Sequence, residues 1–197
     1  MNKINFQDLK KPYLIGEIGI NHNGDMQLAK KLIDASFSTG WNSVKFQKRN
    51  PDLCVPEHQK GVMRDTPWGR MSYLNYKYKI EFGKEEYDYI DEYCFQKPIQ
   101  WSASVWDIDS LKFLMNYENV PYIKIPSAML TDKLLMKESA KTKKQLIIST
   151  GMSTLEEVDN AVNLVMKHGI DPVILHSNSC YPAPLKDLNL RVIPFFI

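Results

Sequence analysis

The chain has 197 residues, of which 44% are hydrophobic and 24% are charged, a composition typical of a soluble globular domain. Its net charge of +2 gives no bulk electrostatic attraction to nucleic acid or to a membrane surface. Because the three cysteines show no metal-type spacing and no apolar run has signal-peptide or membrane-spanning length, we expect a cytoplasmic protein without disulfides.

Short apolar segments rich in β-branched residues alternate with helical patterns along the chain. The strands are predicted at about residues 13–19, 43–47, 99–104, 122–126, 145–150 and 172–178. The helices are predicted at 26–39, 84–96, 108–116, 132–142 and 155–168, with Gly40 and Gly169 at C-terminal caps and Ser153 or Thr154 as an N-cap. Residues 48–83 are predicted as a long packed loop. This alternation of strands and helices predicts a parallel sheet.

Two parallel architectures fit this pattern, a doubly wound sheet and a (β/α)8 barrel. No Gly-x-Gly-x-x-Gly follows the first strand, which disfavours a dinucleotide-binding doubly wound sheet. Polar residues instead lie at the carboxyl ends of nearly all strands, where TIM barrels build their active sites. These residues are Glu17, Lys45, Gln47, Ser102, Ser104, Lys124, Ser127, Ser149, Thr150, Ser177 and Ser179. Because such barrels take about 250 residues, the expected fold class is α/β, a TIM (β/α)8-type barrel that is incomplete, with about six βα units.

Two lysines lie inside apolar strands, Lys45 in SVKFQ and Lys124 in YIKIPS. A buried ammonium without a partner is costly or has a lowered pKa, so each lysine needs an anion, a covalent carbonyl partner or a carboxylate such as Glu17. Hydroxyl groups at neighbouring strand ends favour a phosphate or carboxylate pocket. Ser149 is the strongest of these hydroxyls because it leads into a helix N-terminus.

The first strand ends in YLIGEIGINHNGD, which places an acid, two amides and an imidazole together. Glu17 is expected to be buried in a core strand, so it requires either a partner or a function. Asn21 and His22 are candidates for substrate contacts. The alternatives are that Asn21 shapes a turn and that His22 is a loop histidine with satisfied hydrogen bonds.

The stretches IGEIGINHNGD, SVKFQKR, YIKIPSA, IISTGMSTLEE and LHSNSCYPAP occur in this order, and together they resemble the N-acetylneuraminate (sialic acid) synthase family. The resemblance extends from Tyr13 to Pro194. It implies a (β/α)8 barrel that condenses phosphoenolpyruvate with an acylated amino sugar such as N-acetylmannosamine, giving a nine-carbon 2-keto acid and phosphate. It also implies a divalent metal, Mn2+ or Mg2+, that polarises the sugar aldehyde.

The resemblance implies roles by motif position. Lys45 and Lys124 correspond to the lysines that bind phosphoenolpyruvate, and Glu17 corresponds to an acid at the sugar end of the site; these three are the expected catalytic residues. The expected substrate-binding residues are Asn21, His22, Gln47, Ser104, Ser127, Ser149, Ser179 and Tyr181. Met129 stands where sialic acid synthases usually have Glu, and Ser179 where many have Asn. The acylated amino sugar therefore stays open.

The family's two metal-binding histidines and its frequent C-terminal antifreeze-like domain correspond to positions beyond Ile197. The expectation is thus a single truncated barrel domain at 1–197 that lacks the metal's histidine ligands and does not turn over substrate. Two alternatives remain open. One is a Schiff-base aldolase with Lys45 or Lys124 as nucleophile; the other is a non-catalytic binding or assembly fragment, suggested by the apolar tail VIPFFI. A homodimer is also open, and no nucleic-acid or membrane partner is expected.

Overall fold

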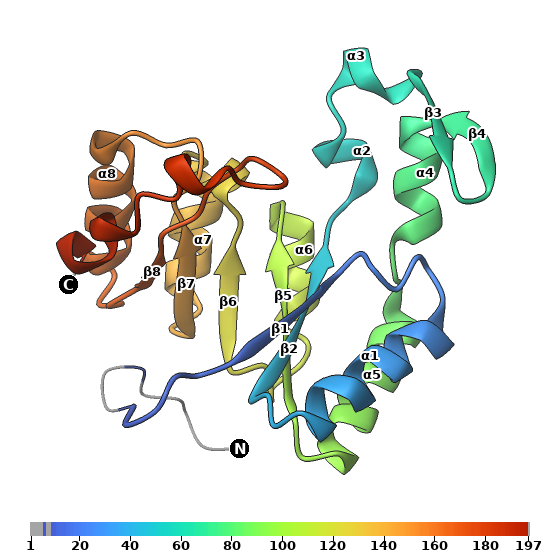
Figure 1. Cartoon of the computed structure of the whole chain (residues 1–197), viewed down its shortest axis with the longest axis horizontal. Helices are drawn as coiled ribbons and strands as arrows, with labels where there is room; N and C mark the ends of the chain where they lie inside the picture. The colour runs from blue at the N-terminus through green and yellow to red at the C-terminus, as the bar shows by residue number, and fades with distance from the viewer. Residues whose placement is uncertain (1–5, 7–8, 197) are drawn as a thin grey trace. The chain divides into compact units, whose positions relative to one another are not determined.

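The computed structural model describes residue 6 and residues 9–196 (Figure 1). The chain divides into two compact units, Met1–Pro121 and Tyr122–Ile197. No helix in the described part of the chain is long and apolar enough to span a membrane. The last residue of the apolar tail VIPFFI, Ile197, lies outside the described residues, so the expectation attached to that tail is not resolved by the structure.

The first unit contains parallel strands in the order β1, β2, β5. The predicted packed loop at 48–83 is wrong, because short helices, a β-hairpin and a two-turn helix occupy it. The elements of this unit are β1 (Ile15–Gly19), α1 (Met26–Ser38), β2 (Ser43–Lys48), α2 (Pro51–Cys54), α3 (Glu57–Lys60), β3 (Met63–Thr66), β4 (Gly69–Ser72), α4 (Tyr73–Ile80), α5 (Lys84–Gln96), β5 (Gln100–Val105) and α6 (Ile108–Leu114).

The second unit contains three further parallel strands in the order β6, β7, β8. Its elements are β6 (Tyr122–Ile125), η2 (Ser127–Met129), α7 (Lys133–Lys141), β7 (Gln145–Ser149), α8 (Leu155–Met166), β8 (Val173–Leu175), η3 (Leu185–Asp187) and η4 (Leu190–Phe196). The six strand predictions and the five helix predictions are therefore confirmed, with ends that differ by a few residues. After β8 the described chain forms the short 3-10 helices η3 and η4.

The helix ends follow the predicted capping chemistry. Of the two candidate caps of α8, Thr154 is the N-cap: its hydroxyl accepts from the Glu157 N–H at 3.2 Å, and Glu157 Oε2 accepts from the Thr154 N–H at 2.8 Å. Helix α1 ends at Thr39, and Gly40 follows with a φ of 79°, a conformation that glycine adopts at little cost. These local signals account for the start of α8 and for the end of α1.

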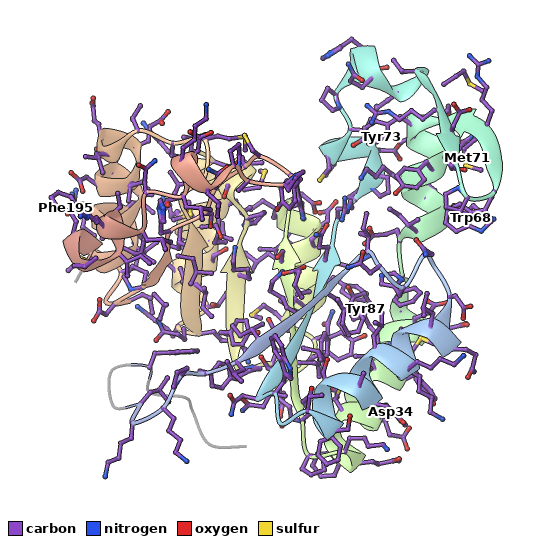
Figure 2. All side chains as sticks on the ribbon, in the orientation of Figure 1. Asp34, Trp68, Met71, Tyr73, Tyr87 and Phe195 are labelled. Carbon is purple, nitrogen blue, oxygen red and sulfur yellow. The ribbon has the colours of Figure 1, made fainter. Side chains whose placement is uncertain are left out.

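Helices α1, α5 and α6 of the first unit pack on a single face of its sheet. Tyr87 of α5 connects them: its ring contacts Phe46 of β2, Trp101 of β5 and Phe113 of α6, with centroids 6.1, 5.5 and 5.3 Å away (Figure 2). Helix α1 joins the same layer, since Tyr93 of α5 donates to its Asp34. One-sided cover of parallel strands is the arrangement of a barrel wall, whereas a doubly wound sheet has helices on both faces.

Strand β1 contains one irregular step. Glu17 pairs with Lys45, but the next paired residue, Gly19, lies opposite Phe46, so Ile18 is an extra residue in β1. Gly19 has a φ of 56°, which glycine adopts more readily than other residues. The bulge therefore lies at the carboxyl end of the strand, directly before the Asn-His-Asn-Gly turn.

Candidate functional site

Strand register gathers polar side chains on one face of the first sheet. Glu17 lies beside Lys45, Lys45 beside Ser102, and Gln47 beside Ser104. Neighbouring residues in a parallel pair point to the same side, and side chains alternate along a strand. Because Phe46 points toward the helices, these polar side chains point to the opposite face, which corresponds to the inside of a barrel.

Lys45 is the buried cation of this face, with 6% of its surface exposed. Its ammonium forms an ion pair with the carboxylate of Glu17 and donates a hydrogen bond of 2.8 Å to Ser104 Oγ. Burial lowers the pKa of Lys45, and Glu17 opposes that shift. Of the partners expected for Lys45, the structure thus shows the carboxylate of Glu17. The expectation that Glu17 is buried is wrong, because 52% of its side chain is exposed.

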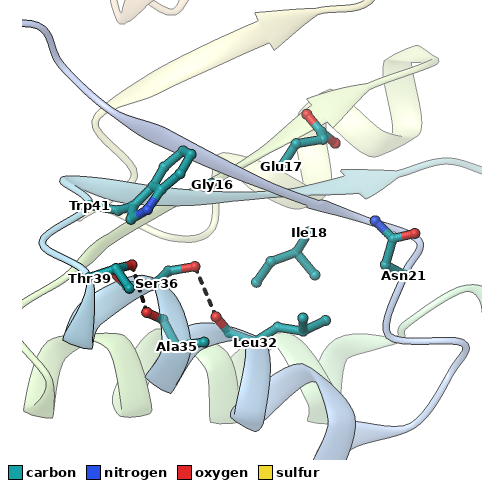
Figure 3. A pocket seen from close by; sticks show the side chains of 9 residues that line it. All are labelled: Gly16, Glu17, Ile18, Asn21, Leu32, Ala35, Ser36, Thr39 and Trp41. Carbon is teal, nitrogen blue, oxygen red and sulfur yellow. Dashed lines mark hydrogen bonds between the residues drawn. The ribbon is translucent and has the colours of Figure 1, made fainter. Parts of the chain in front are cut away.

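Glu17 and Gln47 converge over the bulge of β1. A methyl group placed on Gly19 would lie 2.9 Å from Glu17 Oε1 and 3.3 Å from Gln47 Nε2. Figure 3 shows that the Glu17 side chain leaves β1 on the side opposite Ile18, which points toward α1. A carboxylate and an amide close together on an accessible face are suited to binding the hydroxyl groups of a sugar.

Lys124 is the buried cation of the second unit, with 6% of its surface exposed. Its ammonium donates to Ser149 Oγ at 2.6 Å and to the carbonyl of Ile125 at 2.8 Å. Lys124 lies beside Ile147 in the sheet register, and Ser149 is two residues further along β7, so both side chains lie on one face. The structure therefore brings these two predicted residues together.

Gly151 holds two more predicted serines close to that strand end. Its N–H donates to Ser127 Oγ at 3.0 Å. A methyl group on Gly151 would overlap Ser179 Oγ and would lie 2.9 Å from Ser127 Oγ. Both hydroxyls therefore surround the glycine that follows β7 and Thr150, and no larger residue fits there without movement of the loop.

The same lysine–serine arrangement occurs once in each unit. In both cases the ammonium donates to the serine oxygen, so the hydroxyl hydrogen of Ser104 and of Ser149 must point elsewhere. Within residues 9–196, neither hydroxyl donates to a protein acceptor in the observed hydrogen bonds. An ammonium beside an available O–H group provides two donors to one anionic oxygen.

Three further predicted residues differ in their surroundings. His22 is 2% exposed, and its ring stacks on Phe82 with centroids 3.9 Å apart, on the helix-covered face. Its Nδ1 accepts from the Gly24 N–H at 3.1 Å, as the loop-histidine alternative expects. Asn21 is exposed, and Tyr181 is 95% exposed. Their substrate contacts stay predictions.

His22 predicts an acid-sensitive fold. Burial lowers its pKa from 6.5 to about 4, with a smaller contribution of the same sign from Arg49 and an opposing one from the Gly19 backbone. In the unfolded chain His22 is therefore protonated below about pH 6.5, whereas in the folded chain it stays neutral down to about pH 4. The free energy of unfolding consequently falls as the pH drops from about 6.5 to about 4. Urea unfolding at several pH values checks this. Equal pH dependence in the chain and in His22→Phe would contradict it.

A cavity of about 340 Å³ lies against β1 and α1, and the predicted site residues Glu17 and Asn21 are among its lining residues (Figure 3). Its walls include Leu32, Ala35, Trp41 and the hydroxyls of Ser36 and Thr39, which donate to carbonyls of their own helix. Lys45 is not among the lining residues. The cavity therefore does not coincide with the lysine–serine arrangement of β2.

Sequence reasoning missed a buried charged group directly after the site strand. Arg49 is 5% exposed, and its Nε lies 3.3 Å from Glu81 Oε2; Lys48 Nζ lies 2.8 Å from Glu81 Oε1. The signal was available for Glu81, because this acid stands between Ile80 and Phe82, which are both buried. For Arg49 the signal was weaker, since a basic residue that follows a strand is usually exposed.

The metal implied by the family resemblance would need a group of His, Cys, Asp or Glu side chains as ligands. In the part of the chain that the structure describes, no group of three or more His, Cys, Asp or Glu is arranged to hold a metal ion. The described residues therefore do not fit the implied Mn2+ or Mg2+ centre.

Parallel strands with one-sided helix cover, and polar groups at the strand carboxyl ends, define an incomplete TIM-type (β/α) barrel domain. The chain belongs to the NeuB family, whose model matches residues 32–196. A solved structure of N-acetylneuraminic acid (sialic acid) synthetase from Leptospira borgpetersenii, in complex with citrate, superposes with a TM-score of 0.86 at 27% identity. The superposed region covers 99% of this chain and 66% of the synthetase chain.

Curated relatives extend the comparison. The chain is 32% identical over 188 residues to N,N'-diacetyllegionaminic acid synthase of Campylobacter jejuni, covering 93% of this chain and 56% of the relative. It is 36% identical over 186 residues to N-acetylneuraminate-9-phosphate synthase of Drosophila melanogaster, covering 92% of this chain and 49% of the relative. The chain thus spans about half the length of these relatives.

Proposed function

We propose that this chain carries the phosphoenolpyruvate-binding and sugar-binding residues of a synthase that forms a nonulosonic (sialic) acid. The single observation that carries the proposal is the repeated pairing of a buried lysine with a serine hydroxyl, Lys45 with Ser104 and Lys124 with Ser149. Phosphoenolpyruvate has two anionic ends, a carboxylate and a phosphate, and each end requires cationic and hydroxyl donors. Membership of the NeuB family supports this choice of ligand.

In the proposed reaction, the enol carbon of phosphoenolpyruvate forms a bond to the aldehyde carbon of the acylated amino sugar. Water then adds to the resulting cationic carbon, and phosphate leaves with its bridging oxygen, giving the 2-keto acid. Lys45 and Lys124 neutralise the anionic groups, and Ser104 and Ser149 orient them. Ser127 and Ser179, held near Gly151, add hydroxyl donors.

Glu17 and Gln47 bind the acceptor sugar in this proposal. Glu17 is half exposed and Gln47 approaches it over Gly19, so both reach a ligand on the open face. Glu17 also opposes the lowering of the Lys45 pKa that burial causes, and so favours the charged ammonium. The relatives named above make different acids, so the acceptor is proposed only as an acylated amino-sugar aldehyde.

Titration calorimetry with phosphoenolpyruvate tests the proposal. Lys45→Met and Lys124→Met should each weaken binding by at least about tenfold, the loss expected for one charge-assisted contact. Lys31→Met and Lys137→Met are the matched controls, since both lysines lie exposed on helices of the respective units. Unchanged affinity in both site variants would overturn the proposal.

Turnover is a separate question from binding. The expectation that the chain releases no phosphate from phosphoenolpyruvate plus N-acetylmannosamine is checked by a phosphate-release assay with added manganese. Turnover near that of longer relatives would contradict this expectation. The cytoplasmic location, the assembly alternative and a homodimer likewise stay predictions.

A Schiff-base aldolase is the second candidate, favoured by one observation. Burial lowers the pKa of Lys45, and a lysine nucleophile must lose its proton before it attacks a carbonyl. Borohydride trapping with pyruvate, followed by mass spectrometry, separates the two functions. An adduct on Lys45 supports the aldolase, and its absence together with phosphoenolpyruvate binding supports the synthase.

A further inference from the structure

The segment between β2 and α5 gathers three cations, which we call the cation cluster: Arg49, Arg64 and Lys77. Arg49 follows β2, Arg64 lies in β3 and Lys77 lies in α4. Figure 2 labels Tyr73, Met71 and Trp68 in the same segment. The cluster lies entirely within the first unit and contains neither of the lysines assigned above to phosphoenolpyruvate.

Arg49 forms the buried base of the cation cluster. Its guanidinium lies 5.1 Å from the Trp106 ring centroid and donates to Gln47 Oε1. Its Nε is buried and, within the described part of the chain, has no hydrogen-bond partner although Glu81 lies at ion-pair distance. This side chain is therefore rigidly held but not fully satisfied.

Lys77 and Arg64 share one aromatic ring. The Lys77 Nζ lies 5.0 Å, and the Arg64 guanidinium carbon 3.8 Å, from the Tyr73 ring centroid. No ion pair to either side chain is found within residues 9–196. Burial, together with smaller contributions from Arg49 and Arg64, lowers the pKa of Lys77 to about 8. Like charges thus crowd a partly buried ammonium.

The negative charge near the cation cluster does not balance it. Glu81 is the carboxylate that favours charged Lys77, but it already binds Lys48 and Arg49. Cys54 is the other acidic group facing Lys77, and burial together with Asp107 raises its pKa to about 12, so the thiol stays neutral. An added anion would relieve the repulsion among the three cations.

We propose that Arg64 and Lys77, supported by Arg49, form a second anion-binding site, for a phosphate or carboxylate group. Arg64 is exposed, so a ligand reaches the cluster from solvent. The site itself is independent of the proposed function. The bound anion has two possible origins. One is a phosphate group carried by the acceptor sugar; this origin rests on the proposed function, and it follows from the hydrogen bond between Arg49 and Gln47. The other is free inorganic phosphate.

Thermal unfolding of the full chain tests the site, comparing phosphate with chloride at equal ionic strength. Phosphate should raise the Tm of the wild type more than chloride does. Lys77→Met should remove part of this response and should itself raise the Tm without phosphate, because one repelling charge is gone. Lys79→Met is the matched control: it is an exposed lysine of the same helix, and its response should equal that of the wild type.

The phosphoenolpyruvate lysines could also bind phosphate, so Lys124→Met is measured in parallel. The part of the response that disappears in Lys77→Met should persist in Lys124→Met. Arg64→Gln, a change at an exposed side chain, should also lose that part and serves if Lys77→Met does not fold. A full phosphate response in both Lys77→Met and Arg64→Gln, with a lower Tm for Lys77→Met, would overturn the proposal.

Calorimetry then separates the two sources. If the acceptor sugar carries the anion, N-acetylmannosamine 6-phosphate should bind at least about tenfold tighter than N-acetylmannosamine, and Lys77→Met should remove that advantage. Equal affinity for both sugars, with a phosphate response that needs Lys77, assigns the site to the free anion. No dependence on Lys77 for any of these ligands refutes the site, whatever the result for phosphoenolpyruvate.

Discussion

Replacing Tyr87 by alanine is expected to lower the free energy of unfolding by about 3–5 kcal/mol, the range for large aromatic truncations in a core. The side chain is 1% exposed and contacts rings from β2, β5 and α6. Its removal would leave a cavity where the helix layer meets the sheet. Urea unfolding followed by circular dichroism measures the loss.

Tyr87→Phe is the control, because it keeps the ring and removes the hydroxyl. That hydroxyl donates to the carbonyl of Gln47 at 2.9 Å, so its loss leaves one buried acceptor unsatisfied and should cost about 1 kcal/mol. If Tyr87→Ala costs no more than Tyr87→Phe, the ring is not a central packing element. Because Gln47 and Lys45 both lie in β2, the two variants also measure how much Tyr87 stabilises the strand that carries Lys45.

Gly151→Ala is expected to cost about 1–3 kcal/mol of stability, the range for overpacking, and to weaken phosphoenolpyruvate binding. The new methyl group would overlap Ser179 Oγ and would lie 2.9 Å from Ser127 Oγ. The loop must move to admit it, which displaces the hydroxyl hydrogen-bonded to the Gly151 N–H. Thermal unfolding and calorimetry on the same sample measure the two effects.

Gly61 provides the matched control for the effect of a methyl group on a glycine. Its φ of −85° suits any residue, and a methyl group there meets no atom within 4 Å. Gly61→Ala should therefore keep phosphoenolpyruvate binding and should gain about 0.4–1 kcal/mol from the reduced freedom of the unfolded chain. Equal behaviour of the two alanine variants would show that crowding at Gly151 has no consequence.

The parallel sheet and the burial of both lysines could be predicted because each depends on a local pattern. Apolar β-branched runs marked the six strands, and lysines inside such runs had to be buried near donors or anions. Lys45 and Lys124 are both 6% exposed, as that reasoning requires. Thr154 could be predicted as a cap because Glu157 completes its capping box.

The segment at 48–83 could not be predicted in this way. Helices α2 and α3 contain four residues each, too few to show a helical period, and the hairpin strands are equally short. The cation cluster could consequently not be predicted from the sequence, because Arg49 and Lys77 interact only through the tertiary structure. The exposure of Glu17 was not predicted, because the position of a residue within an apolar strand does not show which face of the sheet lacks packed helices.

The extra residue in β1 has a consequence for sequence comparison and for protein engineering. Gly19 already lies opposite Phe46, so a deletion at Ile18 would restore regular pairing and would remove the side chain that points toward α1. An alignment that places a gap there would shift Asn21 and His22, in the turn after the strand, by one position relative to β1. Loop length can vary elsewhere in such a domain, but this strand needs its extra residue to place an apolar side chain toward α1.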